Sequence, residues 1–158
     1  ADASQEAVLQ AAEFPMAALS PALFLWFPLF FLGGYLLYAS LFAAIGSAVE
    51  QQQDAQGLMA PVSMLIVVPI LLIGFVLDNP NATLSVVMSL VPFFAPILMI
   101  VRLAVTDVPV WQVLAAVVLL AGGFVGTIWL SSRIYRVGIL MYGKKPGLKD
   151  LARWIRYA

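Results

Sequence analysis

The chain contains no cysteine and no histidine among its 158 residues, and only 10% of those residues are charged. Without cysteine it has no disulfide framework and no thiolate site. Without histidine it lacks the commonest metal ligand and the most frequent general base. No pair of carboxylates lies within an apolar stretch either. We therefore expect no catalytic residue and no metal site, and we do not expect an enzyme.

The chain also lacks a nucleotide-binding loop. The glycine pairs Gly33-Gly34 and Gly122-Gly123 are not accompanied by the Lys and Ser or Thr that cradle phosphate groups. We expect no ATP site and no cofactor on this chain. We interpret these glycines, together with Gly126, as positions where helices pack closely. No ionisable side chain is expected at mid-membrane depth, which disfavours a secondary carrier or channel.

Apolar side chains, by contrast, are abundant: they make up 63% of the residues, and the mean hydropathy is +1.02. A soluble domain of this length lacks the interior to bury so much apolar surface. Four uncharged stretches approach the roughly 20 residues that a bilayer span requires. They are Ala22–Ile45, Leu58–Leu77, Ala82–Val101 and Val108–Ser132. The composition therefore predicts an all-α integral membrane protein.

Positive charge is concentrated near the end of the chain. Residues 133–158 contain seven of the eight Lys and Arg residues and one acidic residue, a net charge of +6, whereas the preceding residues carry −6. Because basic flanks favour the cytoplasmic side, we expect the tail 133–158 to be cytoplasmic and the chain to lie in the inner membrane of the cell. Within the tail, Leu148–Ala158 has an amphipathic pattern that predicts an interfacial helix on an anionic leaflet.

Two prolines, Pro92 and Pro96, interrupt the third apolar stretch. Proline removes a backbone donor and clashes with the preceding turn, so a straight helix through both is unfavourable. We therefore expect two half-helices, Ala82–Leu90 and Ile97–Ala104, on either side of a break. Together they would form a re-entrant helical hairpin of about 82–104, which enters the membrane and leaves it on one face.

The surroundings of the prolines favour the same interpretation. The residues before them, Val91 and Ala95, should depart from helical angles. The flanking turns, residues 78–81 and 106–109, each carry an acidic residue, and Arg102 is the one cation near them. Backbone that leaves the helical conformation is tolerated in a membrane only where protein or water provides its hydrogen bonds. A kinked helix that spans the bilayer is the alternative.

This choice decides which side of the membrane the loop Gly46–Gly57 faces. With a cytoplasmic tail, four crossings would place the loop outside, whereas a hairpin places it inside. Ser47 and Glu50 fit a capping box, and Gly57 suits a helix stop, so we expect a short polar helix or an extension of the first span. Glu50 and Asp54 repel each other at a spacing of four. They are either a solvated face or a docking surface for a basic partner.

Four blocks of sequence carry a resemblance to a known family. They are Tyr35–Pro61, Asp78–Pro80, Ser89–Met99 with Arg102, and Trp129–Pro146. In order and spacing these blocks resemble the second, exporter-type class of ABC transporter permeases, and more narrowly the sodium-efflux permease branch. The likeness covers nearly everything from about Phe30 to Trp154. The chain departs from the family at Ala95, where members carry Ser, and at Gln53 or Asp54, where they carry glutamate.

The resemblance implies that residues 1–158 form a single transmembrane domain, the C-terminal half of a six-span permease. The fourth, fifth and sixth spans would correspond to about 22–45, 58–77 and 108–132. Short re-entrant helices would join the fifth and sixth spans on the outer side. The chain begins Ala-Asp-Ala-Ser rather than with Met, and we interpret it as part of a longer protein.

The implied function is that of the permease component of an ATP-driven exporter. Its partners would be a separate ABC ATPase subunit that carries ATP and Mg²⁺, a second permease chain in a homo- or heterodimer, and the lipid bilayer. No nucleic acid is expected. The substrate would be sodium, or a drug or lipid. The alternative function is that of a non-transporting membrane scaffold or assembly subunit.

Two groups of residues follow as site candidates. An outer gate in the hairpin would include Pro92, Phe93, Phe94, Pro96 and Arg102. A cytoplasmic, ATPase-facing loop would include Glu50, Asp54 and Gln56. The loop would have a secondary role, because the usual coupling helix of the family lies in the N-terminal half.

Overall fold

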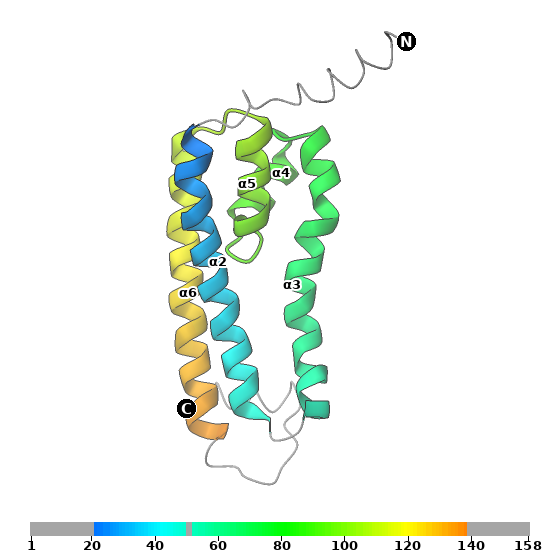
Figure 1. The fold of residues 1–158 in the computed structure, drawn as a ribbon, viewed down its shortest axis with the longest axis vertical. Coiled ribbons are helices and arrows are strands. Elements are labelled where there is room, and N and C mark those ends of the chain that lie inside the picture. Colours follow the sequence, from blue (N-terminus) through cyan, green and yellow to red (C-terminus); the bar gives the residue numbers. More distant parts are fainter. Residues whose placement is uncertain (1–20, 50–51, 139–158) are drawn as a thin grey trace, which may run out of the picture.

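A computed structural model describes residues 21–49 and 52–138 of the chain, and every regular element in these ranges is a helix (Figure 1). The helices are α2 (Pro21–Ala48), α3 (Gln52–Asp78), α4 (Thr83–Leu90), α5 (Ala95–Val105) and α6 (Val110–Gly138). Three of them contain segments that are long and apolar enough to cross a membrane: Pro21–Ala48, Ala55–Asp78 and Val110–Arg136. These three candidate spans overlap the uncharged stretches expected at 22–45, 58–77 and 108–132, although α6 begins two residues later than expected, at Val110.

The helices form a bundle in which α5 is central. Helices α2 and α6 lie side by side, and α3 stands on the other side of the short pair α4 and α5 (Figure 1). Helix α5 contacts all four of the other helices. The short pair occupies the half of the bundle where α2 begins and α3 ends (Figure 1). The two short helices therefore fill the space between α3 and the α2–α6 pair in that half of the bundle.

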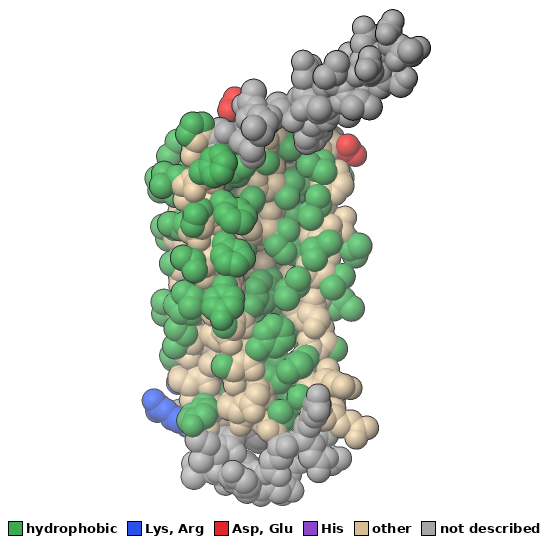
Figure 2. Space-filling view, viewed as in Figure 1, with side chains coloured by type: hydrophobic (Ala, Val, Ile, Leu, Met, Phe, Trp, Pro, Cys, Tyr) green, Lys and Arg blue, Asp and Glu red, His purple; other side chains and the backbone are tan. Residues whose placement is uncertain are grey.

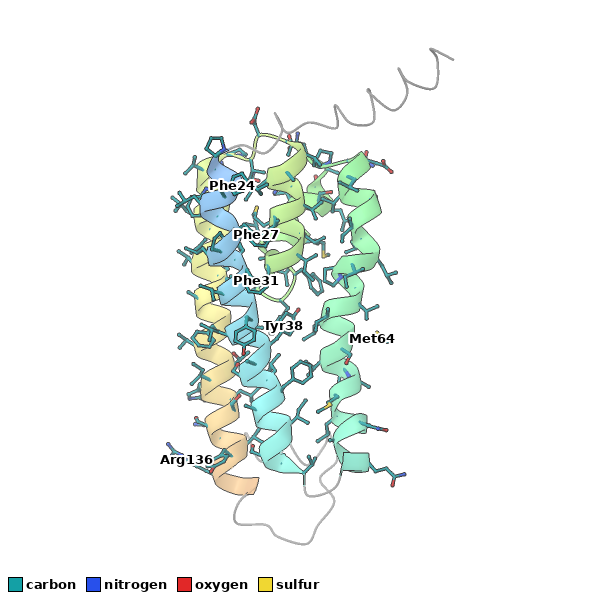
Figure 3. The ribbon with its side chains drawn as sticks, viewed as in Figure 1. Phe24, Phe27, Phe31, Tyr38, Met64 and Arg136 are labelled. Carbon is teal, nitrogen blue, oxygen red and sulfur yellow. The ribbon has the colours of Figure 1, made fainter. Side chains whose placement is uncertain are left out.

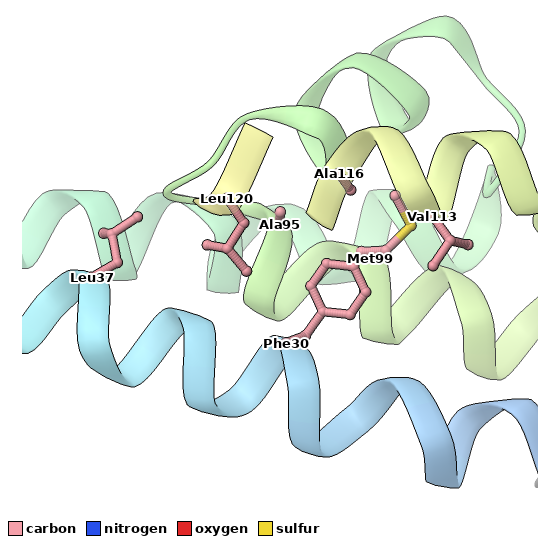
Figure 4. Packing of buried hydrophobic residues seen from close by; sticks show 7 residues of the cluster. All are labelled: Phe30, Leu37, Ala95, Met99, Val113, Ala116 and Leu120. Carbon is pink, nitrogen blue, oxygen red and sulfur yellow. The ribbon is translucent and has the colours of Figure 1, made fainter. Parts of the chain in front are cut away.

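The hydrophobic core lies where α5 meets α2 and α6 (Figure 4). Its buried members are Phe30, Leu37, Ala95, Met99, Val113, Ala116 and Leu120. On the outside, apolar side chains are spread over most of the length of the visible face (Figure 2). Phe24, Phe27 and Phe31 of α2 point away from the bundle (Figure 3). Such an apolar exterior is compatible with lipid as the solvent, because lipid chains do not penalise exposed hydrocarbon.

The polar loop between the first two spans differs from its prediction. Helix α2 ends at Ala48, and Ser47 still lies within it, where its hydroxyl donates to the Ala44 carbonyl at 2.8 Å. Ser47 therefore does not cap a new helix. Helix α3 begins at Gln52 and continues through Gly57, so the helix stop expected at Gly57 is wrong. The polar helical segment extends the second span rather than the first, because the Gln and Ala residues around Gly57 are good helix formers that outweigh its penalty of about 1 kcal/mol.

Several predictions concern residues outside the described ranges. Glu50 and the amphipathic helix expected at Leu148–Ala158 both fall there. The tail 133–158, expected to be cytoplasmic, is described only as far as Gly138.

Candidate functional site

The helix break at the two prolines is the first feature of the site. Helix α4 is followed by Val91 in an extended conformation, with φ −63° and ψ 125°, as expected before Pro92. Ala95 is already the first residue of α5, so the expected departure from helical angles is wrong there. Pro96 lies in the first turn of α5, where its missing N–H has no helical acceptor to lose. Pro92 therefore interrupts the helix, and Pro96 begins the next one.

The chain turns back on itself at this break. We call α4, the turn 91–94 and α5 together the hairpin. The segments before α4 and after α5 lie at the same end of the bundle, and the tip of the hairpin reaches about halfway along it (Figure 1). Two hydrogen bonds join the two ends of the hairpin: Arg102 Nε donates to the Pro80 carbonyl at 2.8 Å, and Asn81 Nδ2 donates to Thr106 Oγ1 at 3.4 Å. Residues 82–101 thus do not run from one end of the bundle to the other.

Arg102 is fully buried near the base of the hairpin, with 0% of its surface exposed. Besides its bond to Pro80, its Nη1 donates to Ser89 Oγ at 2.9 Å and its Nη2 donates to Gln112 Oε1 at 3.0 Å. These three partners belong to the turn before α4, to α4 and to α6. All three are neutral oxygen atoms. A buried cation needs such partners because an unsatisfied one would carry a large desolvation penalty. The Arg102 side chain therefore ties the base of the hairpin together and to α6.

The sequence pointed to Arg102 but not to its partners. Ser89 is fully buried, and so is Ser85 one helical turn before it, whose hydroxyl donates to the Asn79 carbonyl at 2.6 Å. The available signal was the spacing of Ser85 and Ser89, four residues apart on one face of an otherwise apolar half-helix. A polar face on so short an apolar helix indicates an inward, hydrogen-bonded surface.

The tip of the hairpin packs directly on glycines of the long helices. A β-carbon added at Gly34 of α2 would lie 2.6 Å from Pro96 Cβ, and one added at Gly123 of α6 would lie 2.7 Å from Pro92 Cβ. Gly33 is similarly close to the Leu120 side chain. The interpretation of these three glycines as packing positions is confirmed. For Gly122 and Gly126 it is wrong within the described ranges, because a β-carbon there would meet no atom within 4 Å.

The remaining gate candidates lie around the same tip. Phe93 and Phe94 are partly buried, and Phe93 packs against the core. The Phe93 carbonyl accepts a hydrogen bond from the Tyr38 hydroxyl of α2 at 2.6 Å. The structure thus brings Pro92, Phe93, Phe94 and Pro96 together, and it places Arg102 away from them near the base. Tyr38 was not among the predicted site residues, although a tyrosine within an apolar span indicates a polar partner for its hydroxyl.

A second polar contact joins α2 and α6 below the tip. Ser40 Oγ donates to Thr127 Oγ1 at 2.7 Å, and Ser131 Oγ lies 2.8 Å from the Ser40 carbonyl. Hydroxyl side chains of this kind hold membrane helices together across close contacts. Beside them lies a groove of about 300 Å³ between the two helices, lined by Ser40, Ala43, Ala44, Ser47, Ile128, Ser131, Ser132 and Tyr135.

The candidate ATPase-facing residues lie at the other end of the bundle. Asp54 and Gln56 belong to the first turns of α3, far from the turn where α3 leads into the hairpin (Figure 1). Gln56 is exposed, whereas the side chain of Asp54 is outside what the structure describes, as is the whole of Glu50.

Comparison with known proteins gives one family and two relatives. The family model described as ABC-2 family transporter protein matches residues 7–133. Uncharacterized protein YhaP of Bacillus subtilis is 35% identical over 130 residues, which are 82% of this chain and 31% of that protein. Uncharacterized protein MJ1024 of Methanocaldococcus jannaschii is 28% identical over 127 residues, 80% of this chain and 32% of that protein. The chain thus spans about a third of the length of these relatives. No solved structure matches it.

Proposed function

The chain belongs to the ABC-2 family of transporter proteins, and we propose that it forms part of the translocation path of an ATP-driven exporter. The family match, over most of the chain, is the observation that carries this proposal. Members of the family are transport components rather than enzymes in themselves, and the three apolar helices make this chain a multi-pass membrane protein. A separate ABC ATPase, which carries ATP and Mg²⁺, would drive the transport. The family match does not favour a non-transporting scaffold.

In this proposal the hairpin is re-entrant. Helix α4 has 8 residues and α5 has 11, so at 1.5 Å per residue they are roughly 12 Å and 16 Å long. Neither can cross roughly 30 Å of hydrocarbon. Because both ends of the hairpin lie at one end of the bundle, the hairpin would enter and leave the membrane on the same face.

The hairpin face would be the outer face. Arg133 and Arg136 lie toward the opposite end, near the end of α6, and the Arg133 guanidinium stacks over the Trp129 ring at 4.2 Å. Tryptophan and basic residues are typical of the boundary between lipid and cytoplasm. In this orientation the C-terminus would be cytoplasmic, and so would the loop between α2 and α3. Glu50, Asp54 and Gln56 would offer the ATPase a secondary contact there.

The hairpin would serve as part of an outer gate. Its tip residues Pro92 and Pro96 lie against α6 and α2 respectively. Neither contact leaves room for a β-carbon on the glycine of the long helix. A change in the tilt of α2 or α6 would therefore displace the tip rather than be absorbed at the contact. Arg102 would keep the base of the hairpin attached to α6 while the tip moves. Phe93 and Phe94 would form the apolar part of the closure.

The remaining parts of the proposal concern the whole transporter. A second permease chain, identical or related, would face this one across the path. The substrate would be sodium, or a drug or lipid. The residues of the parent protein beyond this chain would supply the other spans and the main coupling contact with the ATPase.

The test is reconstitution of the full-length parent protein with its ATPase in sealed proteoliposomes. Uptake of radioactive sodium and of a panel of lipophilic dyes is measured with ATP and Mg²⁺, and with an ATPase variant that cannot hydrolyse ATP. The proposal predicts transport of at least one substrate that stops in the inactive variant. Failure of the parent protein to bind the ATPase, or flux that persists without hydrolysis, would contradict it.

A further inference from the structure

The hydroxyl of Tyr38 lies between two backbone carbonyls that belong to different elements. Its oxygen is 2.6 Å from the Phe93 carbonyl oxygen at the tip of the hairpin and 3.0 Å from the Leu65 carbonyl oxygen in α3. Tyr38 itself lies on α2 (Figure 3). One side chain therefore reaches the tip of the hairpin and α3 from a third helix.

Both carbonyls have lost the donor that a continuous helix would provide. The Leu65 carbonyl would accept from residue 69, but that residue is Pro69, which lies inside α3 and has no N–H. The Phe93 carbonyl would accept from Ile97, but the Ile97 N–H donates to the Phe94 carbonyl at 3.1 Å instead. In a membrane interior a backbone carbonyl without a donor is unfavourable, because no water is present to replace the lost partner. The Tyr38 hydroxyl thus lies beside two carbonyls that each lack a helical N–H donor.

A phenol has one proton to donate, so it serves one of these carbonyls at a time. The shorter distance favours Phe93 when the hairpin is in the position described. If the tip moves away, the proton can turn to Leu65 without leaving Tyr38 unpaired. The hydroxyl therefore has an acceptor in two arrangements. In one it donates to Phe93 at the tip, and in the other it donates to Leu65 of α3.

We infer that Tyr38 is a positioning residue that couples the hairpin tip to α3 by sharing its proton between the Phe93 and Leu65 carbonyls. Only the expected effect of this coupling on transport rests on the proposed role of the hairpin as a gate. The coupling itself is a property of the bundle and can be measured without any substrate.

The test is a double-mutant cycle read at the hairpin tip. A Val91→Cys reporter is placed in the full-length parent protein after any cysteines elsewhere have been replaced; this chain contributes none of its own. The rate of reaction with N-ethylmaleimide reports how often the tip meets water, because the thiolate is the reactive form. The backgrounds are the unmodified protein, Tyr38→Phe, Pro69→Ala, and both substitutions together. Tyr35→Phe is the matched control, since Tyr35 lies on the same helix with 63% of its surface exposed.

Tyr38→Phe should speed labelling roughly fivefold to tenfold, the population shift that corresponds to one lost hydrogen bond. Pro69→Ala gives Leu65 its own helical donor, so Tyr38 is left to Phe93 alone and labelling should slow. In the Tyr38→Phe background the same Pro69→Ala change should have no effect, and Tyr35→Phe should leave the rate unchanged.

Equal effects of Pro69→Ala in both backgrounds would overturn the inference, because they would show that the proline acts through the shape of α3 and not through Tyr38. An unchanged rate in Tyr38→Phe would overturn it as well. If the cycle holds while reconstituted transport fails, the coupling stands and the proposed function falls, so the two results are separable.

Discussion

Pro96 of the hairpin rests directly on Gly34 of α2: a β-carbon built at Gly34 would lie 2.6 Å from Pro96 Cβ and 2.7 Å from Pro96 Cγ. Pro92 makes the corresponding contact with Gly123 of α6. The two prolines that interrupt the hairpin are thus also the residues that seat it, one on each of the adjacent long helices. The absence of a side chain at each glycine is what permits this approach.

The first prediction follows from these contacts. Gly34→Ala or Gly123→Ala should destabilise the protein by about 1–3 kcal/mol, the range typical of overpacking, because a proline ring cannot rotate away as a flexible side chain can. The thermal unfolding midpoint of the purified protein in detergent provides the measurement. Gly122→Ala is the matched control, since a β-carbon there meets nothing within 4 Å and alanine favours the helix. Equal losses at Gly122 and Gly123 would refute the packing described.

A second prediction concerns Arg102. Arg102→Ala should lower the free energy of unfolding by about 2–4 kcal/mol, because it leaves the Ser89 hydroxyl and the Gln112 side-chain amide without a charged partner in a buried site. The same substitution at the exposed Arg136 should change it by less than about 0.5 kcal/mol. The comparison is made by denaturant or thermal unfolding of the two variants. Similar stability for both would mean that the base of the hairpin does not depend on Arg102.

The third prediction separates the two prolines. Replacement of both Pro92 and Pro96 with Ala should impair export and leave membrane insertion intact, because the chain is no longer forced to break. Since Pro96 lies in the first turn of α5, Pro92→Ala alone should account for most of the loss. ATP-dependent export in vesicles is measured beside the amount of inserted protein. The exposed Pro61 of α3 provides a control, and export as fast as in the unmodified protein would count against the gate.

A fourth prediction concerns the polar contact below the hairpin. Thr127→Val keeps the shape of the side chain but removes the hydroxyl that lies 2.7 Å from Ser40 Oγ, so the α2–α6 pair should lose about 0.6–1 kcal/mol. Ser132→Ala is the control, because the Ser132 hydroxyl donates only within its own helix, to the Trp129 carbonyl. Thermal unfolding of the two variants measures the difference in their stability. A larger loss for Ser132→Ala would be inconsistent with a contact between helices.

The long helices and the break between α4 and α5 could be predicted because their causes are local. Span length, hydropathy and the missing N–H of Pro92 act within a few residues of the chain. The prediction at Gly57 is wrong because the helix formers around that residue carry α3 past the expected stop. The prediction at Ala95 is wrong because a proline in the first turn of a helix is compatible with that helix.

The contacts of the candidate site could not be predicted, because they join residues far apart in the sequence. Nothing near Gly34 distinguishes it from Gly126, yet of these two glycines Gly34 has a proline ring against it and Gly126 does not. Likewise the sequence shows that Arg102 needs buried oxygen atoms but not that Gln112 supplies one of them. Such pairings depend on how the hairpin turns between the long helices, which is a property of the assembled bundle.

The most direct test of the re-entrant hairpin is the accessibility of its two ends. Single cysteines replace Asn79, Asp107 and Gln56, which are all exposed, and each is labelled with a membrane-impermeant maleimide from either side of sealed vesicles. A hairpin that returns to its face of entry predicts labelling of positions 79 and 107 from the outside and of position 56 from the cytoplasmic side. Labelling of positions 79 and 107 from opposite sides would show that residues 82–101 cross the membrane, and it would remove the gate and the cytoplasmic loop together.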